Sequence, residues 1–349
     1  MGSQKLVGLS VTLALITLGG IYYYKNRAHT ETLQVVTWSN YLPDESLEKF
    51  TRKTGIRVEV SYISSNEELL AKIKAGATGF DVIQPSDYMV RQMVSLDILL
   101  PLDHARLSHI EHLAPEYRNL PYDPGLKYSV PFNWGTTGIA VNMEKVAVSE
   151  PVGWGLLFDS PDPSHTALLD DMREVFAAAL RYQGHSINEA ATDKLQSAQE
   201  LIAKTRNAIL MFTSEPRALL QNGELNIAHI YSSDGLQAAA DNPKFRFFIP
   251  KEGGVLWTDN LAIPKTSQHM EQAHRFIDFF LDPDNAIGVV KDKWLATPNR
   301  AVLARLPPDQ ALNRSLYPPP NVLESLQFIA DIGGALIELS RLWTELKSS

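Results

Sequence analysis

The hydrophobic pattern near the start of the chain predicts a strand, a helix and a second strand. An apolar run over residues 33–36 stops at a polar and aromatic turn, Trp38-Ser39-Asn40-Tyr41. Pro43 suits the first position of a helix, because proline has no N–H to leave unpaired there. Alternating apolar and charged residues over 56–60 then predict the second strand. The turn follows the carboxyl end of the first strand, which is the edge where open α/β sheets bind ligands.

Apolar runs and amphipathic stretches alternate along the rest of the chain, so the fold class is predicted to be α/β. Strands are expected at 128–132 and 138–141, separated by the polar stretch 133–137. A helix is expected to begin at Leu168, with Asp170 or Asp171 as its cap. Another strand is expected at 261–264. Further helices are predicted at 66–75, 89–96, 192–204, 216–221 and 270–281, with one more at the C-terminus.

Length, charge and cysteine content narrow the function classes. The 349 residues are enough for two domains of ordinary size. The formal net charge of -8 argues against a nucleic-acid partner and favours a cationic ligand. The chain has no cysteine, which excludes disulfides, thiolate catalysis and zinc–cysteine sites.

The N-terminal segment differs in kind from the remainder. Residues 6–21 are apolar and small, Lys5 precedes them, and three tyrosines follow at 22–24. This pattern is typical of a secretory signal segment, although it is short for a membrane span. Residues 1–32 are therefore interpreted as an export signal, either cleaved or retained as an inner-membrane anchor. The protein is expected in the periplasm.

No catalytic or metal-binding signature is present. The sequence lacks a Gly-x-Ser-x-Gly elbow, a Walker A loop, a Gly-x-Gly-x-x-Gly fingerprint and a His-Glu-x-x-His motif. His109, Glu111 and His112 are close in sequence, but such a polar stretch beside prolines is more often plain surface. No cofactor and no metal are predicted.

Aromatic residues recur beside carboxylates or hydroxyls where apolar runs end. Aromatic faces attract ammonium groups by about 0.5–2 kcal/mol, and carboxylates accept charge-assisted hydrogen bonds from them. The pattern therefore suits an organic polycation, while a glycosidase or a sugar-binding site would use the same residue types. The clusters are Trp38-Ser39-Asn40-Tyr41, Ser86-Asp87-Tyr88, Asp171 with Glu174, Tyr231-Ser232-Ser233-Asp234 and Trp257-Thr258-Asp259.

From about residue 33 onward the chain resembles the periplasmic polyamine-binding proteins of spermidine/putrescine ABC transport systems. Many short motifs occur in the family's order. They are Thr-Trp-Ser-Asn-Tyr at 37–41, Thr-Gly-Ile-Arg-Val at 54–58, Ser-Asn-Glu at 65–67, Gly-Phe-Asp-Val at 79–82, Pro-Ser at 85–86, Trp-Gly-Thr-Thr-Gly-Ile at 134–139, Arg-Glu-Val-Phe at 173–176, Ile-Pro-Lys-Glu-Gly-Gly at 249–254, Leu-Ala-Ile-Pro at 261–264, Thr-Pro-Asn at 297–299 and Leu-Tyr-Pro-Pro at 316–319.

The resemblance implies a two-lobed periplasmic binding protein fold of type II, with the ligand in the interlobe cleft. Residues 33–134 with 260–310 would form lobe 1, and residues 135–259 with 311–349 would form lobe 2. By similarity the aromatic walls are Trp38, Tyr41, Tyr88, Tyr231 and Trp257, the hydroxyls are Ser39 and Ser86, and the carboxylates are Asp171, Glu174 and Asp259.

The function implied is that of a monomeric extracytoplasmic receptor that closes on a polyamine and delivers it to an inner-membrane ABC permease. The alternative is a polyamine sensor that passes the closed form to a membrane signalling protein. A remote alternative is an exported carbohydrate-active enzyme that uses Asp171, Glu174 or Asp259. The leading interpretation is not an enzyme.

The chain departs from the family pattern at several positions, which affects the expected ligand preference. Asn40 stands where the family is commonly acidic, and Asp87 is acidic where a small neutral residue is usual. Asp234 matches an acidic position of putrescine binders, and Tyr231 replaces a usual tryptophan. Ile329 falls where spermidine binders carry glutamine. We hypothesise that Asp87 supplies the negative charge that Asn40 lacks.

If Asp87 compensates for Asn40, then Asp87→Ala weakens polyamine binding more than Asn40→Asp does, because only the first change removes a carboxylate. Calorimetric titration of the two variants and the parent protein measures this order. A larger loss for Asn40→Asp would contradict the compensation.

Overall fold

The computed structural model describes residues 32–76, 79–159, 165–206 and 208–348. The predicted export signal at 1–32 therefore lies almost wholly outside the described residues. Within the described ranges, no helix is long and apolar enough to cross a membrane.

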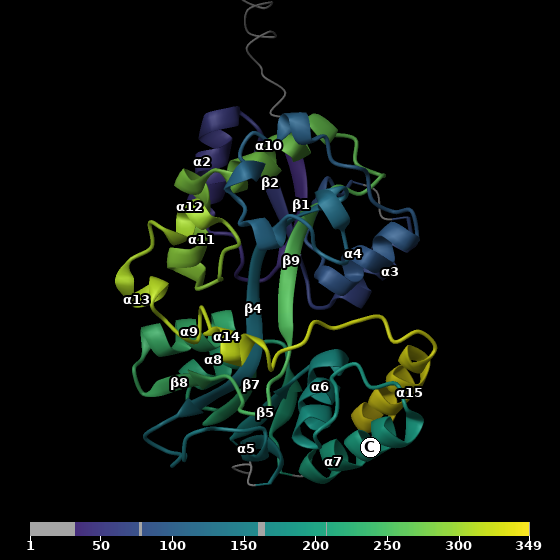
Figure 1. Cartoon of the computed structure of the whole chain (residues 1–349), viewed down its shortest axis with the longest axis vertical. Helices are drawn as coiled ribbons and strands as arrows, with labels where there is room; N and C mark the ends of the chain where they lie inside the picture. Colours follow the sequence, from purple (N-terminus) through teal and green to yellow (C-terminus); the bar gives the residue numbers. More distant parts are fainter. Residues whose placement is uncertain (1–31, 77–78, 160–164, 207, 349) are drawn as a thin grey trace, which may run out of the picture.

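The described elements alternate between strands and helices (Figure 1). The strands are β1 (Thr32–Trp38), β2 (Arg57–Ile63), β3 (Val82–Ile83), β4 (Ser129–Asn142), β5 (Thr166–Leu169), β6 (Met211–Thr213), β7 (Ile227–Tyr231), β8 (Phe245–Phe248) and β9 (Leu256–Ala262). The helices up to the middle of the chain are α2 (Asp44–Thr54), α3 (Asn66–Lys74), α4 (Asp87–Ser95), α5 (Gly155–Phe158), α6 (Met172–Tyr182), α7 (Thr192–Arg206), α8 (Pro216–Gln221) and α9 (Ser232–Asp241). The remaining helices are α10 (Met270–Leu281), α11 (Pro283–Lys293), α12 (Arg300–Leu303), α13 (Pro308–Ala311), α14 (Pro320–Leu323) and α15 (Ala335–Ser348), and short 3-10 turns lie between α4 and β4.

One sheet runs through the molecule in the order β2-β1-β3-β9-β4-β7-β5-β6, and β8 also pairs with β4. β1 pairs in parallel with β2 and β3, and β9 runs antiparallel to β3 and β4. The first part of β4, from Ser129 to Thr136, pairs with β9, and its later part pairs with β7 and β8. β4 and β9 therefore connect the two ends of the sheet.

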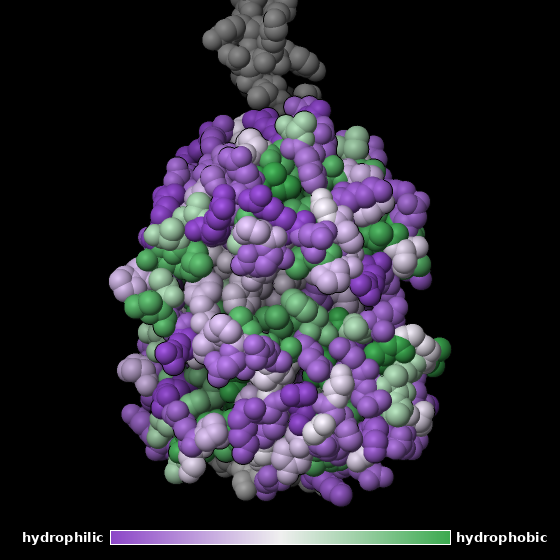
Figure 2. Space-filling model, viewed as in Figure 1, coloured by the Kyte–Doolittle hydropathy of each residue, from purple (hydrophilic) through white to green (hydrophobic). Residues whose placement is uncertain are grey.

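The molecule has two lobes, joined by the long strands β4 and β9 (Figure 1). We call the part around β1, β2, β3, α2, α3, α4 and α10 the upper lobe, and the part around β5, β6, β7, β8, α6, α7, α8, α9 and α15 the lower lobe. One hydrophobic cluster, which contains Phe50 and Phe276 with their rings edge to face, lies mainly in the upper lobe, and another, which contains Trp154 and Phe176, lies in the lower lobe. A further cluster joins Val290 of α11 to Leu236 of α9. Figure 2 shows a largely hydrophilic surface, with hydrophobic residues visible at the level where the lobes meet.

The predicted lobe boundaries at 134/135 and 259/260 fall inside β4 and β9. Both strands are continuous there, so the backbone passes between the lobes without a linker. The residue ranges of the lobes stay a prediction, while the two-lobed α/β architecture is clear from the sheet.

Three element predictions are wrong in detail. Residues 133–137, predicted to separate two strands, lie inside β4, whose fourteen residues are all buried. Leu168 lies inside a strand, because residues 166–169 form β5, and the helix begins only at Met172. β9 begins at Leu256, not at 261. In each case pairing with a strand distant in sequence overrides the local pattern.

Candidate functional site

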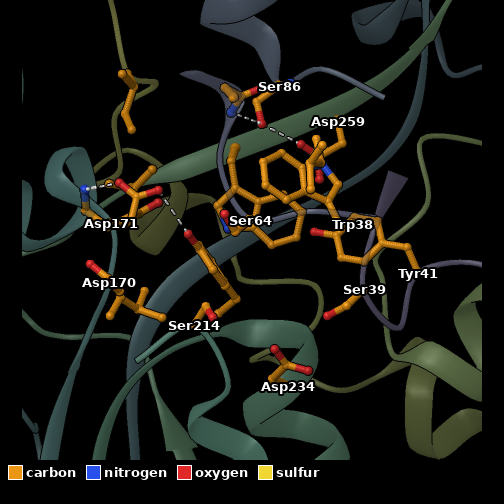
Figure 3. Close-up of a pocket in the computed structure, with 18 of the residues that line it drawn as sticks. Trp38, Ser39, Tyr41, Ser64, Ser86, Asp170, Asp171, Ser214, Asp234 and Asp259 are labelled. Carbon is orange, nitrogen blue, oxygen red and sulfur yellow. Dashed lines mark hydrogen bonds between the residues drawn. The ribbon is translucent and has the colours of Figure 1, made fainter. Parts of the chain in front are cut away.

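A cavity of about 360 Å³ lies between the lobes. All twelve residues predicted from the sequence to bind ligand lie around it. They come from the turn after β1, the start of α4, the start of α6, the β7–α9 junction and β9. Figure 3 shows Asp259 and Asp171 on opposite sides of the cavity and Asp234 at its lower end. The fold therefore brings the predicted clusters together, and their contact with a ligand stays a prediction.

The first corner of the cavity is held by Asp259, whose side chain is 2% exposed. Ser86 Oγ donates a hydrogen bond to Asp259 Oδ1 over 2.6 Å (Figure 3). Asn66 fixes this serine from the other side, since its Nδ2 donates to Ser86 Oγ and its Oδ1 accepts from Ser86 N, both at 3.0 Å. Burial raises the pKa of Asp259 to about 6. One carboxylate oxygen is thus positioned by neighbours, and the group still titrates near neutral pH.

The opposite corner is built on the N-terminus of α6. Asp171 caps this helix, because its Oδ1 accepts from the backbone N–H groups of Arg173 at 2.9 Å and Glu174 at 3.1 Å. Its other oxygen accepts from the hydroxyl of Tyr231 at 3.4 Å. Glu174 is only 4% exposed, and its Oε2 has no hydrogen-bond partner among the described residues. Burial, reinforced by the neighbouring Asp171, raises the pKa of Glu174 well above its ordinary value. A buried carboxyl oxygen without a donor favours a ligand that brings one.

Asp87 begins α4 and is 3% exposed. Its two oxygens accept from the backbone N–H groups of Tyr88 at 2.6 Å and Thr258 at 3.0 Å. Burial nevertheless raises its pKa to about 8, which those two hydrogen bonds partly counteract. Asp87 thus ties α4 to β9 as well as lining the cavity.

The aromatic walls form two pairs. The rings of Trp38 and Tyr41 are 6.5 Å apart and tilted by 48°, and those of Tyr231 and Trp257 are 6.1 Å apart and perpendicular. Gly135 on β4 pairs with Trp257 on β9, and a Cβ at Gly135 would overlap the indole ring. A glycine is therefore needed at this position to seat the tryptophan. Trp257 and Asp259 are two residues apart on one strand, so both face the cavity.

The cavity wall is strongly acidic. Among its described lining residues, eight are aspartate or glutamate and none is lysine, arginine or histidine. Lys72 and Lys347 form ion pairs with two half-exposed members of this wall, Glu68 at 2.6 Å and Asp170 at 2.5 Å. Arg173 lies over the ring of Tyr88 and donates to the carbonyl of Ala330 at 2.9 Å. Burial also raises the pKa of Asp234 to about 6, and Arg217 partly counteracts this. Buried carboxylates without cations are unfavourable, so the site favours either protonation or a cationic ligand.

Sequence reasoning missed several lining residues, chiefly Tyr62, Glu68, Asp170, Ser214 and Glu215. Glu215 follows β6 just before the proline that begins α8, which is the same strand-end signal that located the other carboxylates. Asp170 forms an ion pair with Lys347 at 2.5 Å. The sequence left two candidates for the helix cap, Asp170 and Asp171. The structure shows that Asp171 caps α6.

Asn40, expected to stand at an ammonium subsite, is not among the lining residues. Its amide donates to Gln237 and accepts from Lys293. Ile329, which falls where spermidine binders carry glutamine, lines the cavity. The glutamine two positions earlier, Gln327, is not among the lining residues and accepts a hydrogen bond from Ser186. His109 contacts Asp278 at 3.0 Å, and the described ranges contain no group of three residues that could hold a metal ion.

The cleft and the fold define a solute-binding receptor. The chain belongs to the family of bacterial extracellular solute-binding proteins, whose family model matches residues 45–312. The two-lobed fold predicted from the motifs is confirmed by solved structures of substrate-binding proteins that the chain matches.

Its relatives agree with the resemblance found in the sequence. The chain is 33% identical over 339 residues to the spermidine/putrescine-binding periplasmic protein of Salmonella typhimurium, covering 96% of this chain and 97% of that protein. It is 33% identical over 332 residues to a putrescine/cadaverine-binding protein of Pseudomonas aeruginosa, covering 91% and 94%. The solved structure of the spermidine/putrescine ABC transporter substrate-binding protein PotD from Streptococcus pneumoniae matches with a TM-score of 0.77 at 31% identity, covering 91% of this chain and 99% of that chain.

Replacing Trp257 and Asp259, two of the β9 residues that line the cavity, tests the site. We expect Trp257→Ala and Asp259→Asn each to weaken binding of the expected polyamine at least tenfold, about 1.4 kcal/mol. The first change removes a ring face and the second a charge held by Ser86. Calorimetry measures both, and Asp97→Asn, an exposed aspartate outside the cavity lining, is the matched control. Unchanged affinity in both variants would place the binding site elsewhere.

The raised pKa values predict opposite effects of pH on stability and on binding. The folded protein takes up protons more readily than the unfolded chain, so stability without ligand rises as pH falls from about 8 to about 4. Affinity for a cation falls as pH falls from about 8, because protonated carboxyls must lose their protons to pair with the ligand, and it falls most steeply below about pH 6, where Asp259 and Asp234 have also taken up protons.

Thermal unfolding without ligand and calorimetry at several pH values measure the two trends. Asp259→Asn is expected to flatten the affinity profile near pH 6, about where Asp259 takes up its proton. A pH-independent affinity would show that these carboxyls do not pair with the ligand.

Proposed function

We propose that the protein binds a linear polyamine of the putrescine or spermidine type in the cavity between its lobes. The observation that carries this proposal is the cavity wall of eight acidic and no basic side chains. A ligand with several ammonium groups neutralises these carboxylates and donates the hydrogen bonds that they lack.

The arrangement of the carboxyls favours an elongated ligand. Asp259, Asp171 and Asp234 stand at separate places around the cavity (Figure 3). Separated anions match amino groups spaced along a chain, and the rings of Trp38 and Trp257 offer faces for ammonium groups and methylene linkers. A neutral sugar would leave the same carboxylates buried and unpaired, which is unfavourable.

Binding is proposed to stabilise contact between the lobes, because the cavity wall contains residues of both. A ligand that touches both lobes shifts the equilibrium toward the closed arrangement. We propose that an inner-membrane ABC permease recognises this arrangement in the periplasm, with the protein acting as a monomer. The N-terminal segment would direct export and, if retained, would tether the protein to the inner membrane. A membrane signalling protein is the alternative partner, and co-purification from membranes distinguishes the two.

Calorimetric titration of the purified protein tests the proposed ligand. The panel is putrescine, cadaverine, spermidine, norspermidine and spermine, with an amino acid and maltose as controls. We expect a dissociation constant of about 1 μM or lower, close to -8 kcal/mol, for at least one amine. Absence of binding to all five amines would refute the proposal, and binding of maltose alone would assign the site to sugars.

A further inference from the structure

Beside the Asp234 end of the cavity, side chains of the two lobes are joined by direct hydrogen bonds. Asn40, in the turn after β1, donates from Nδ2 to Gln237 Oε1 on α9 over 3.0 Å. Lys293, the last residue of α11, donates from Nζ to Asn40 Oδ1 over 2.9 Å. Gln237 Nε2 donates back to the backbone carbonyl of Lys293, also at 2.9 Å. Together these three residues form a closed set of contacts, which we call the clasp.

The orientation of both amides in the clasp is determined by cations. Arg217 Nη1 donates to Gln237 Oε1 at 2.7 Å, and an arginine has only donors. Gln237 must therefore present its oxygen to Arg217 and Asn40, and its NH₂ to the carbonyl of Lys293. Asn40 must then present its NH₂ to Gln237 and its oxygen to the ammonium of Lys293. Flipping either amide would set donor against donor, so the network has one arrangement.

The clasp joins elements of opposite lobes. Asn40 follows β1 of the upper lobe, and Gln237 and Arg217 lie on α9 and α8 of the lower lobe. Helix α11 follows α10 directly and is held to α2, because Lys49 Nζ donates to the carbonyl of Asp284 at 3.1 Å. The end of α11 lies against α9, as Figure 1 shows. Separation of the lobes would therefore break the clasp.

Residue 40 suits this role in two ways. Its φ of 60° lies in the left-handed region, which asparagine tolerates better than most residues. An amide also donates and accepts at once, whereas an aspartate here would only accept and would lose the donation to Gln237. The adjacent Ser39 makes a second contact between the lobes, from its Oγ to Glu215 Oε1 at 3.3 Å.

None of Asn40, Gln237, Lys293 and Arg217 lines the cavity, although Asn40 and Arg217 lie close enough to the lining carboxylate Asp234 to lower its pKa. From the contacts between the lobes we infer that the clasp stabilises contact between the lobes even when no ligand is bound. Asn40 is then a positioning residue: it sets how long the closed arrangement lasts, and leaves the choice among amines to the cavity wall. The effect on affinity rests on the proposed function, whereas the effect on lobe separation does not.

The first test measures lobe separation without any ligand. The chain has no cysteine, so Lys74→Cys on α3 and Lys204→Cys on α7 give two specific sites for a fluorescent donor and acceptor, one in each lobe. We expect Asn40→Gly and Gln237→Leu each to lengthen the mean distance between the labels. Asp97→Gly is the matched control for Asn40→Gly, because Asp97 also has a left-handed φ, of 58°, and lies outside the clasp. Unchanged distances in both variants would overturn the clasp.

The second test measures the kinetics of amine binding by stopped flow. We expect Asn40→Gly and Gln237→Leu to raise the dissociation rate about fivefold or more, with the association rate nearly unchanged. The factor should be the same for every amine that binds, and the double variant should be no worse than the single ones, since both break one network. Factors that differ among amines would mean that residue 40 acts on the ligand, directly or through Asp234, which would overturn the inference that the clasp acts on lobe contact alone.

The two tests separate failure of the clasp from failure of the proposed function. If the label distances lengthen in the variants but the protein binds none of the five amines, the clasp is supported and the proposed ligand is refuted. A thermal unfolding curve of each variant is the control that establishes whether the variant is folded. Because Gln237 is buried and Asn40 is only partly buried in a turn, the Asn40→Gly result stands even if Gln237→Leu unfolds.

Discussion

The pairing of β4 with β9 is the constraint on which the rest of the molecule depends. These strands are paired from Ser129 to Thr136 and belong to both lobes, so they fix how the lobes face each other. They also build the site, because Trp257 and Asp259 project from β9 into the cavity and Gly135 on β4 leaves room for the indole ring. Movement of the lobes and recognition of the ligand therefore share one pair of strands.

The acidic cavity wall links binding to stability. Desolvation raises the pKa of Asp87, Glu174 and Asp259, so the protein without ligand holds groups that resist ionisation. A polycation reverses this, since each ammonium favours the ionised form of the carboxyl beside it. The buried oxygen of Glu174 that lacks a hydrogen-bond donor would likewise be stabilised by an ammonium group of the ligand. On the proposed function, the free energy lost by burying these groups is recovered when a polyamine binds, so the site would select for positive charge as well as for shape.

The sequence predicted residues that line one cavity better than it predicted the strands. Clusters such as Ser86 with Asp87, or Asp171 with Glu174, were visible because short polar motifs follow apolar runs, and the fold brings all of them to one cavity. The continuity of β4 was not visible, because its polar middle at 133–137 resembles a loop until β9, more than a hundred residues away, supplies the pairing. The partners of Asn40 were equally hidden, since Gln237 and Lys293 are about two hundred or more residues distant.

Asn40 was expected to stand at an ammonium subsite, but its side chain joins residues of the two lobes. The loss of a carboxylate there looked like the loss of an ammonium subsite. In the structure the amide instead holds a resident cation, Lys293, on one side and a lower-lobe glutamine on the other. A carboxylate could pair with Lys293 but could not donate to Gln237, whose oxygen is already fixed by Arg217. An amide at position 40 therefore meets the requirement of a network that must both donate and accept hydrogen bonds there.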